Sequence, residues 1–355
     1  MAATSVEVKS MGAVHLIMAA GSGSRLFPMS TKSQPKQFIK LENDFSLLQN
    51  TVKRLSHHPE LVITTMEKYK GTLASQLEEL KLECKFTIIV VPETYNTAYS
   101  ICAASQLFKG RKIIAIPSDK VFDSEEFKTL MEAANRILTT KPDKVLLFGI
   151  KPTYPATGFG YLETKGDQVV RFVEKPCLEE AKRYLETGNY YWNGGMLGFT
   201  AEIMNSLCGK HRPDIMKVCN IATSESVVVG FKGMTVIRLS DRVDFGLAIE
   251  DISIDYAITE RLLSDEMTFL PYEGKWIDIG SWKSVYDFLP KTEEGINKSC
   301  HVTCKSYNSR NCLVLSKMPV YLNGVTDLVV VVADDGTIMI SHKDKTQDVK
   351  RLICL

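Results

Sequence analysis

The residues best suited to chemistry lie in a glycine-rich turn near the start of the chain, Ala20-Gly21-Ser22-Gly23-Ser24-Arg25, and in the later segment Pro35-Lys36-Gln37-Phe38. Glycine lets the main chain approach an anion closely, and a turn after an apolar strand presents backbone N–H groups to phosphate oxygens. The Arg25 guanidinium can donate two parallel hydrogen bonds to phosphate oxygens, and the Lys36 ammonium adds a single positive charge. The pattern predicts a nucleoside triphosphate site.

Two familiar nucleotide motifs are excluded by the same residues. A Walker loop requires Gly-Lys followed by Ser or Thr, and the dinucleotide fingerprint requires a third glycine where Leu26 stands. A Gly-x-Gly turn alone is common in proteins, so Arg25 and Lys36 carry most of the weight of this interpretation.

Two carboxylates are candidate ligands for the cation that accompanies a triphosphate. Asp119 follows an apolar run that ends at Ile116, and Asp278 lies in Trp276-Ile277-Asp278-Ile279-Gly280-Ser281-Trp282. Ligands of open α/β sheets bind beyond the carboxyl ends of strands, and Mg²⁺ prefers carboxylate and phosphate oxygens. A helix cap is the alternative role here, and Asp123 is a competing cap. Position alone leaves the two interpretations of Asp119 equal.

A second set of polar residues suits a sugar phosphate. Glu174 and Lys175 end an extended segment, and Asn193 begins Asn193-Gly194-Gly195. Amide and carboxylate groups bind sugar hydroxyls, an ammonium binds phosphate, and Trp192 and Tyr161 would form apolar walls that exclude water. The alternatives are a solvated ion pair and an Asn-Gly hairpin turn.

An alternation of strands and helices is predicted to position these groups. From residue 14 to residue 150, short apolar runs alternate with segments of helical periodicity, which is typical of a parallel sheet covered by helices on both faces. The expected strands are 14–18, 61–65, 87–91, 112–116 and 145–149, and the expected helices are 46–55, 69–80, 98–108 and 125–138.

The second half of the chain mixes strands and helices. The expected elements are hairpin strands at 158–163 and 169–174, helices at 178–186 and 251–263, and an extended segment at 191–200. A large domain is therefore expected over residues 1–294, with a nucleotide half at 12–150 and a sugar half at 151–294. A small β-rich domain is expected over 295–355, with a hairpin of 328–333 and 337–341. No repeat of fixed period is visible there, so a β-helix is not predicted.

Composition excludes several classes of protein. The chain has 355 residues, of which 45% are hydrophobic and 24% charged, and its net charge is +1. Such a balance offers no general attraction to nucleic acid or to an anionic membrane. The start is polar and the following apolar run is too short for a signal or a span, so a cytoplasmic location is expected. The nine scattered cysteines are expected to be reduced.

Taken together, the motifs resemble those of the mannose-1-phosphate guanylyltransferase family, also called GDP-mannose pyrophosphorylases. The matches include the glycine turn with Pro35–Phe38, the segments 93–98, 117–119 and 148–153, and then 157–161, 173–176, 192–196, 253–257 and 276–282. The resemblance implies a Rossmann-like α/β fold with a mixed, mainly parallel sheet, and a small C-terminal β domain. It also implies magnesium-dependent transfer of GMP from GTP to mannose 1-phosphate, with release of pyrophosphate.

The resemblance also assigns residues to roles. Catalytic roles fall to Arg25, Lys36, Asp119 and Asp278, and the two aspartates would hold Mg²⁺. Nucleotide binding falls to Ala20, Gly21, Ser22, Gly23, Ser24, Arg25, Glu93, Asn96, Thr97 and Ser118. Sugar-phosphate binding falls to Gly160, Glu174, Lys175, Asn193 and Asp255. The implied partners are GTP and a hexose 1-phosphate, and a homodimer is one assembly open to the chain.

Three departures from the family pattern affect these expectations. Ala20 replaces a glycine, Tyr95 replaces an arginine near the expected base site, and the chain ends at Leu355. We therefore expect the transferase without the isomerase domain that is fused to some relatives. Transfer of another nucleotide, transfer to another hexose 1-phosphate, and a catalytically silent sugar-nucleotide-binding subunit remain the alternatives.

Overall fold

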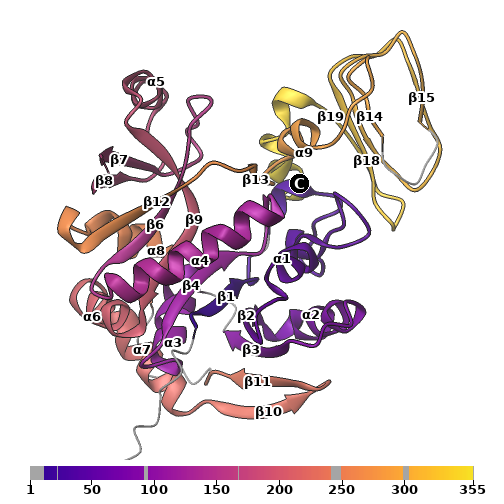
Figure 1. Ribbon diagram of the computed structural model, residues 1–355. Coiled ribbons are helices and arrows are strands. Elements are labelled where there is room, and N and C mark those ends of the chain that lie inside the picture. Colours follow the sequence, from indigo (N-terminus) through magenta and orange to yellow (C-terminus); the bar gives the residue numbers. More distant parts are fainter. Residues whose placement is uncertain are drawn as a thin grey trace, which may run out of the picture.

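An eleven-stranded sheet forms the centre of the molecule in the computed structural model, which describes residues 12–21, 23–91, 95–166, 168–240, 249–298 and 304–354 (Figure 1). Its main path runs β10-β11-β3-β2-β1-β4-β9-β6-β12, with β7 joined to β9 and β8 joined to β7. The strands are β1 (Val14–Met18), β2 (Glu60–Met66), β3 (Lys85–Val91), β4 (Lys112–Pro117), β6 (Val145–Ile150), β7 (Tyr161–Lys165), β8 (Gln168–Val173), β9 (Tyr190–Thr200), β10 (Val227–Phe231), β11 (Met234–Arg238) and β12 (Met267–Tyr272).

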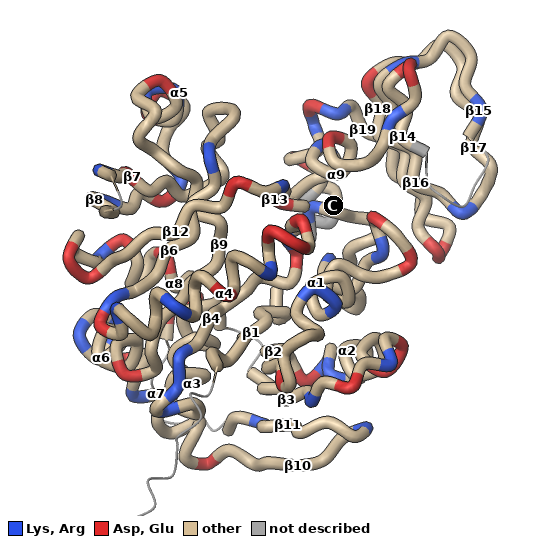
Figure 2. Tube along the Cα trace, viewed as in Figure 1, with Lys and Arg blue, Asp and Glu red and all other residues tan. Residues whose placement is uncertain are grey.

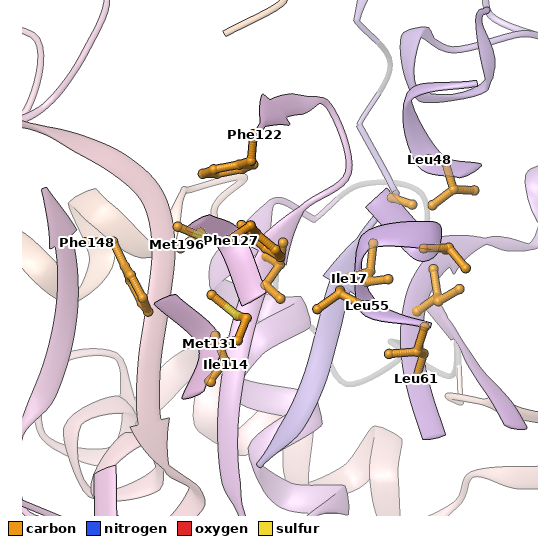
Figure 3. Packing of buried hydrophobic residues seen from close by; sticks show 14 of the residues in the cluster. Ile17, Leu48, Leu55, Leu61, Ile114, Phe122, Phe127, Met131, Phe148 and Met196 are labelled. Atoms are coloured by element: carbon orange, nitrogen blue, oxygen red, sulfur yellow. The ribbon is translucent and has the colours of Figure 1, made fainter. Parts of the chain in front are cut away.

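Helices cover both faces of this sheet. One core joins it to α1 (Leu47–Leu55), α2 (Glu67–Glu79), α4 (Ser124–Thr140) and α5 (Leu178–Thr187). The opposite core joins it to α3 (Thr97–Leu107), α6 (Ala201–His211), α7 (Pro213–Ser224) and α8 (Ile254–Ala257). Figure 3 shows the first core, where side chains of α1 and α4 meet the sheet: Leu48, Leu55, Phe127 and Met131 against Ile17, Ile114 and Met196.

The sequence predicted the first half of this fold well. All five expected strands and all four expected helices are present, displaced by at most a few residues at their ends. Local chemistry explains the agreement at α1, because Ser46 accepts a hydrogen bond from the Gln49 N–H at 3.1 Å and the Gln49 side chain accepts one from the Ser46 N–H at 2.8 Å. The mixed, mainly parallel fold class is confirmed.

The helix expected over 251–263 is wrong. The structure has one α-helical turn, α8, and then the 3-10 turn η3 (Thr259–Arg261). Ile258 leaves the helical conformation with φ −129° and ψ −57°, and the segment is rich in β-branched residues, which favour helices weakly. The apolar residues of this segment are spaced for burial in the core that also contains α3, α6 and α7. Four of them are buried there, namely Ile254, Ala257, Ile258 and Leu262.

Three smaller sheets lie outside the central one. β5 (Lys120–Phe122) pairs antiparallel with β13 (Trp276–Asp278). In the C-terminal part, β14 (Asn297–Lys298), β16 (Leu313–Leu315) and β18 (Leu328–Val332) are parallel, β15 (Cys304–Tyr307) pairs in parallel with β17 (Val320–Asn323), and β19 (Ile338–His342) forms the expected hairpin with β18. These strands form a separate lobe in Figure 1.

The C-terminal lobe contains a coil repeat that the sequence did not reveal. Leu313 pairs with both Asn297 and Val329, while Cys304 pairs with Val320, so successive parallel strands are spaced evenly along the chain. The strand pairing therefore has a fixed period, although the sequence shows none. The repeat is hidden because unlike residues, such as an asparagine, a leucine and a valine, occupy the same place in successive coils.

Charge is spread evenly over the molecule. Figure 2 shows Lys and Arg interspersed with Asp and Glu along the trace, without a continuous basic stripe over the described residues. In the same part of the chain, no helix is both long and apolar enough to cross a membrane.

Strand β1 carries a buried histidine whose titration should affect folding. His15 is 3% exposed, its ring stacks on that of His58 at 3.7 Å, and His57 lies 4.0 Å beyond His58 between ring centroids. Burial, together with the neighbouring His58 and His57, lowers the pKa of His15 to about 3, and burial likewise lowers the pKa of His58 to about 4. Both rings are therefore neutral in the folded protein at ordinary pH.

We expect this histidine pair to make the protein sensitive to acid. Below pH 6.5 the unfolded chain binds protons that the folded chain excludes, so the free energy of unfolding falls as the pH is lowered from 6.5 toward 3. His15 alone accounts for about 2 kcal/mol at pH 5. His15→Phe should therefore weaken the pH dependence of urea unfolding between pH 7 and pH 5, whereas His342→Phe, at a half-exposed histidine, should not. An unchanged slope in His15→Phe would contradict this assignment.

Candidate active site

The glycine turn after β1 lies against the Pro35–Phe38 segment. Gln37 is 2% exposed, and its Nε2 donates hydrogen bonds to the main-chain oxygens of Ala19 and Gly21, both at 2.9 Å. Gly23 has φ +62°, and a Cβ built there would clash with Cγ of Lys36. The turn therefore requires glycine both for its backbone conformation and for the close approach of Lys36.

Two carboxylates and two lysines meet where β5 and β13 pair. The register puts Lys120 opposite Asp278, and Lys120 Nζ lies 2.5 Å from Asp278 Oδ1. Asp119, just before β5, forms an ion pair with Lys36 Nζ. The side chains of Asp119 and Asp278 are 19% and 18% exposed, so both ion pairs are largely shielded from water. The arrangement links the Lys36 segment to a part of the chain that is distant in sequence.

The surrounding charges keep Asp119 ionised despite its burial. Burial alone would raise its pKa, but the ammonium groups of Lys36 and Lys120 hold the pKa of Asp119 well below its usual value. Burial would lower the pKa of Lys120, and Asp278 and Asp119 raise it above the ordinary lysine value instead. Asp119 and Lys120 are therefore both charged at neutral pH, a state suited to binding a cation or phosphates.

Asp119 is not a helix cap. Asp123 fills that role for α4, because its Oδ1 accepts a hydrogen bond from the Glu125 N–H at 3.2 Å. Ser118, expected to bind nucleotide, is 3% exposed and donates from Oγ to the Met18 carbonyl oxygen at 2.7 Å. Its hydroxyl thus joins β4 to β1 and supports the position of Asp119.

Arg25 lies at the edge of a cavity of about 490 Å³ that also reaches Asp278. Its Nη1 donates a 3.4 Å hydrogen bond to Gln347 Oε1, from the segment that follows the C-terminal lobe. The cavity is lined by Arg25, Asp278, residues 154–159, Gly280, Ser281, Lys283, Ser284, Asp287 and Gln347. The glycine turn, β13 and the C-terminal segment therefore share one hollow.

The remaining nucleotide candidates have structural contacts. The Asn96 side chain caps α3 by accepting from the Thr97 N–H at 2.8 Å, and Thr97 Oγ1 accepts from the Ile254 N–H at 2.9 Å. Tyr95 is half-buried, with its ring 4.9 Å from the ring of Tyr99. Ala20 and Gly21 follow β1 as expected. Ser22 and Glu93 lie outside the described residues, as does the side chain of Ser24.

All five expected sugar-phosphate residues gather in the second half. Glu174, whose side chain is 7% exposed, forms an ion pair with Lys175, and Asn193 Nδ2 donates to Asp255 Oδ1 at 3.0 Å. The Asn193 N–H donates to the Gly160 oxygen at 2.7 Å. A Cβ at Gly160 would lie 2.5 Å from Glu174 Oε2, so this position requires glycine. The cluster brings together four separate segments of the sequence.

Asp255 is the carboxyl group of this cluster with the most altered titration. Burial and the nearby Glu174 raise its pKa to about 7, although Lys175 and the hydrogen bond from Asn193 oppose the shift. At neutral pH, Asp255 is therefore divided between a carboxylate and a neutral acid that can donate a hydrogen bond. Both forms suit a sugar hydroxyl.

The apolar wall differs from the expected one. Tyr161 is fully buried, with its ring 5.3 Å from Tyr184, so its expected role as a wall is wrong. Trp192 is also buried, and Phe159 and Trp276 extend the aromatic cluster, at 5.2 Å from Trp192 to Phe159 and 5.3 Å from Phe159 to Trp276. Alternation along β7 turns Tyr161 into the core.

Sequence reasoning missed three residues that shape this site. Gln37 holds the glycine turn, Lys120 pairs with Asp278, and Gln347 reaches Arg25. Gln37 follows Lys36 and Lys120 follows Asp119 in the sequence. Their positions next to candidate residues could therefore have indicated that they belong to the site. Gln347 carries no such signal, because only the folded C-terminal segment brings it close.

Comparison with known proteins places the chain in a family. The family model described as Nucleotidyl transferase matches residues 14–295, and the chain belongs to that family. Among curated relatives, it is similar to mannose-1-phosphate guanylyltransferase of Salmonella montevideo, with 34% identity over 95% of this chain and 72% of the relative.

Two solved structures are also similar to the chain. A Thermus thermophilus protein described as mannose-1-phosphate geranyltransferase has TM-score 0.81 and 24% identity, covering 97% of this chain and 99% of the other, which supports the fold. A Helicobacter pylori protein described as mannose-6-phosphate isomerase has TM-score 0.65 and 27% identity, covering 75% of this chain and 100% of the other.

Proposed function

We propose that this protein transfers GMP from GTP to mannose 1-phosphate and releases pyrophosphate. The observation that carries the proposal is the meeting of Lys36, Asp119 and Asp278 beside the glycine turn, with Lys120, the partner of Asp278, close to Gly195 of the sugar half. Triphosphate and sugar phosphate bound on either side of this point would have their reacting groups side by side. The similarity to mannose-1-phosphate guanylyltransferases supports the choice of base and sugar.

The same carboxylates fit a divalent cation, and we assign Mg²⁺ to them. Both carboxylates are largely shielded from water, lie close to the glycine turn and form ion pairs with lysines. Carboxylate oxygens are the protein ligands that Mg²⁺ prefers. The described residues contain no group of three side chains suited to a metal, so phosphate oxygens and water would complete the coordination. When bound, the ion would neutralise phosphate charge.

The chain's own residues would then position the reactants and balance charge. A sugar phosphate oxygen is ionised at neutral pH, so attack on the α-phosphorus needs no general base. Arg25 and Lys36 would neutralise charge that develops on the leaving pyrophosphate. Glu174, Asn193 and Asp255 would bind sugar hydroxyls.

The sugar-phosphate half gives a prediction at Lys175. Lys175→Ala should raise the KM for the hexose 1-phosphate or lower kcat, while the Kd of the triphosphate alone changes little, because Lys175 lies in the sugar cluster. Titration calorimetry with each ligand separately measures this difference. Lys182→Ala, which removes an exposed lysine from α5, is the control. Equal weakening of both ligands would contradict the division of the site into two halves.

The base preference gives a second prediction. A site that hydrogen-bonds guanine rejects adenine strongly, because its polar groups would be left unpaired. We expect a higher kcat/KM for GTP than for ATP. Tyr95→Arg should change the KM for the triphosphate more than the choice of base, because Tyr95 packs on Tyr99. Similar kcat/KM values for GTP and ATP would overturn the guanine assignment alone.

Other features of the proposal rest on composition and chain organisation. We assign residues 1–294 to the transferase domain, with its halves at 12–150 and 151–294, and residues 295–355 to a small β-rich domain. A cytoplasmic location and a homodimer are further parts of the proposal. Transfer of another nucleotide, transfer to another hexose 1-phosphate, and a silent sugar-nucleotide-binding subunit are the competing functions. All four proposed catalytic side chains are present, which disfavours the silent subunit.

A further inference from the structure

Lys120 lies at the junction of the two halves of the site. Its ammonium pairs with Asp278 at 2.5 Å and lies 5.8 Å from the ring centroid of Trp276, which belongs to the aromatic cluster of the sugar side. Its Cε is 3.9 Å from the position a Cβ would take at Gly195, which lies in strand β9 two residues after Asn193. The lysine therefore pairs with the candidate metal ligand Asp278 and lies close to Gly195 of the sugar half.

The main chain of Lys120 is fixed, whereas its side chain is flexible. Arg54 Nη2 donates to the Lys120 carbonyl oxygen at 3.0 Å, and the β5–β13 register holds the residue opposite Asp278. A lysine side chain has a flexible four-carbon stem, so the ammonium can exchange one anion for another without movement of the strand. Gly195, which has φ +75° and no side chain, leaves the stem uncrowded on that side.

We propose that Lys120 is a tethered cation that occupies Asp278 in the empty enzyme and turns to substrate phosphate in the loaded enzyme. This inference rests on the proposed function. The charges of Lys36 and Lys120 balance those of Asp119 and Asp278, so these four side chains carry no net charge when no ligand is bound. A divalent cation bound to the same carboxylates would neutralise their negative charge. The two ammonium groups would then have no balancing carboxylate and would be attracted to the phosphates of the two substrates.

The position of Lys120 points to the phosphates that react. Lys36 lies against the glycine turn, on the triphosphate side, whereas Lys120 lies between Asp278 and Gly195 of strand β9. An ammonium there can bind the sugar phosphate and the α-phosphate together and hold them in line. Lys120 is thus a further catalytic residue, acting by position and charge.

The first test measures Mn²⁺ binding without substrates, using electron paramagnetic resonance of free Mn²⁺. Lys120→Met removes the competing ammonium and should tighten Mn²⁺ binding about tenfold, because like charges near one carboxylate repel. Lys120→Arg retains the charge and should bind Mn²⁺ as the wild type does. Lys112→Met is the matched control, since the Lys112 ammonium binds the Thr139 hydroxyl at 2.8 Å and is not part of the carboxylate pair.

The second test measures kinetics of the same variants with GTP and mannose 1-phosphate. Lys120→Met should lower kcat at least about tenfold and raise the KM for the sugar phosphate more than that for GTP. Lys112→Met should leave both unchanged. Thermal melting checks folding, and Lys120→Gln replaces Lys120→Met if the latter does not fold.

Either of two results would overturn the inference. One is Mn²⁺ affinity in the neutral variant equal to or weaker than that of the wild type, which would make Lys120 a structural counter-ion. The other is wild-type kcat and KM in that variant. The proposed function fails separately, if the wild-type enzyme releases no pyrophosphate from GTP and mannose 1-phosphate, and the Mn²⁺ comparison remains valid in that case.

Discussion

Replacement of Asp119 or Asp278 by asparagine is expected to lower turnover by roughly a hundredfold or more, as loss of a principal electrostatic group commonly does. Each change keeps the shape of the side chain and removes its charge. It also leaves a lysine without its partner, Lys36 in one case and Lys120 in the other. Both effects weaken the binding of a divalent cation. Steady-state kinetics over a range of Mg²⁺ concentrations measures the loss.

The helix cap Asp123 provides the matched control for this experiment. Asp123→Ala removes the carboxylate that caps α4, four residues after Asp119. It should lower folding stability slightly while leaving turnover unchanged. Wild-type turnover in Asp278→Asn at saturating Mg²⁺ would remove Asp278 from the site, and the same result in Asp119→Asn would remove Asp119.

Arg25→Ala and Lys36→Ala should each lose about 2–4 kcal/mol of transition-state stabilisation, mainly in kcat. The physical reason is that contacts to the leaving pyrophosphate strengthen as its charge develops. Arg25 lies in the cavity that reaches Asp278, and Lys36 pairs with Asp119 beside the glycine turn. Steady-state kinetics at varied GTP concentration separates the effect on kcat from the effect on KM.

Lys40→Ala is the control for these two variants, because Lys40 is exposed and lies in the same segment as Lys36. Melting temperatures should change little in all three proteins. A large fall in melting temperature with unchanged kinetics, in either active-site variant, would instead assign that residue a structural role.

The sequence predicted the fold where local signals and packing agree. Strands β1 and β6 are buried apolar runs, and α1 carries its own capping pair, so each is readable without knowledge of its neighbours. The segment 251–263 misled because its apolar spacing serves burial in the second core rather than a continuous helix. The repeated coils of the C-terminal part were missed because their strands pair at regular intervals, whereas the residues at corresponding positions differ from coil to coil.

The candidate site was predictable to the extent that its motifs are local. The glycine turn, the two aspartates and the cluster around Asn193 were each visible as short patterns, and the structure brings them to one region. Contacts across the fold were not visible. The pairing of Lys120 with Asp278 depends on β5 meeting β13, and the burial of Tyr161 depends on which face of β7 meets the core.

The central claim is that this protein joins a nucleoside monophosphate to a hexose 1-phosphate, and pyrophosphate release tests it most directly. The purified protein is assayed with Mg²⁺ and each of the four common nucleoside triphosphates, against a panel of hexose 1-phosphates. We predict the fastest release with GTP and mannose 1-phosphate, and none when either substrate or Mg²⁺ is omitted. Absence of pyrophosphate release with every pair, from a protein that is folded and binds GTP, would contradict the account.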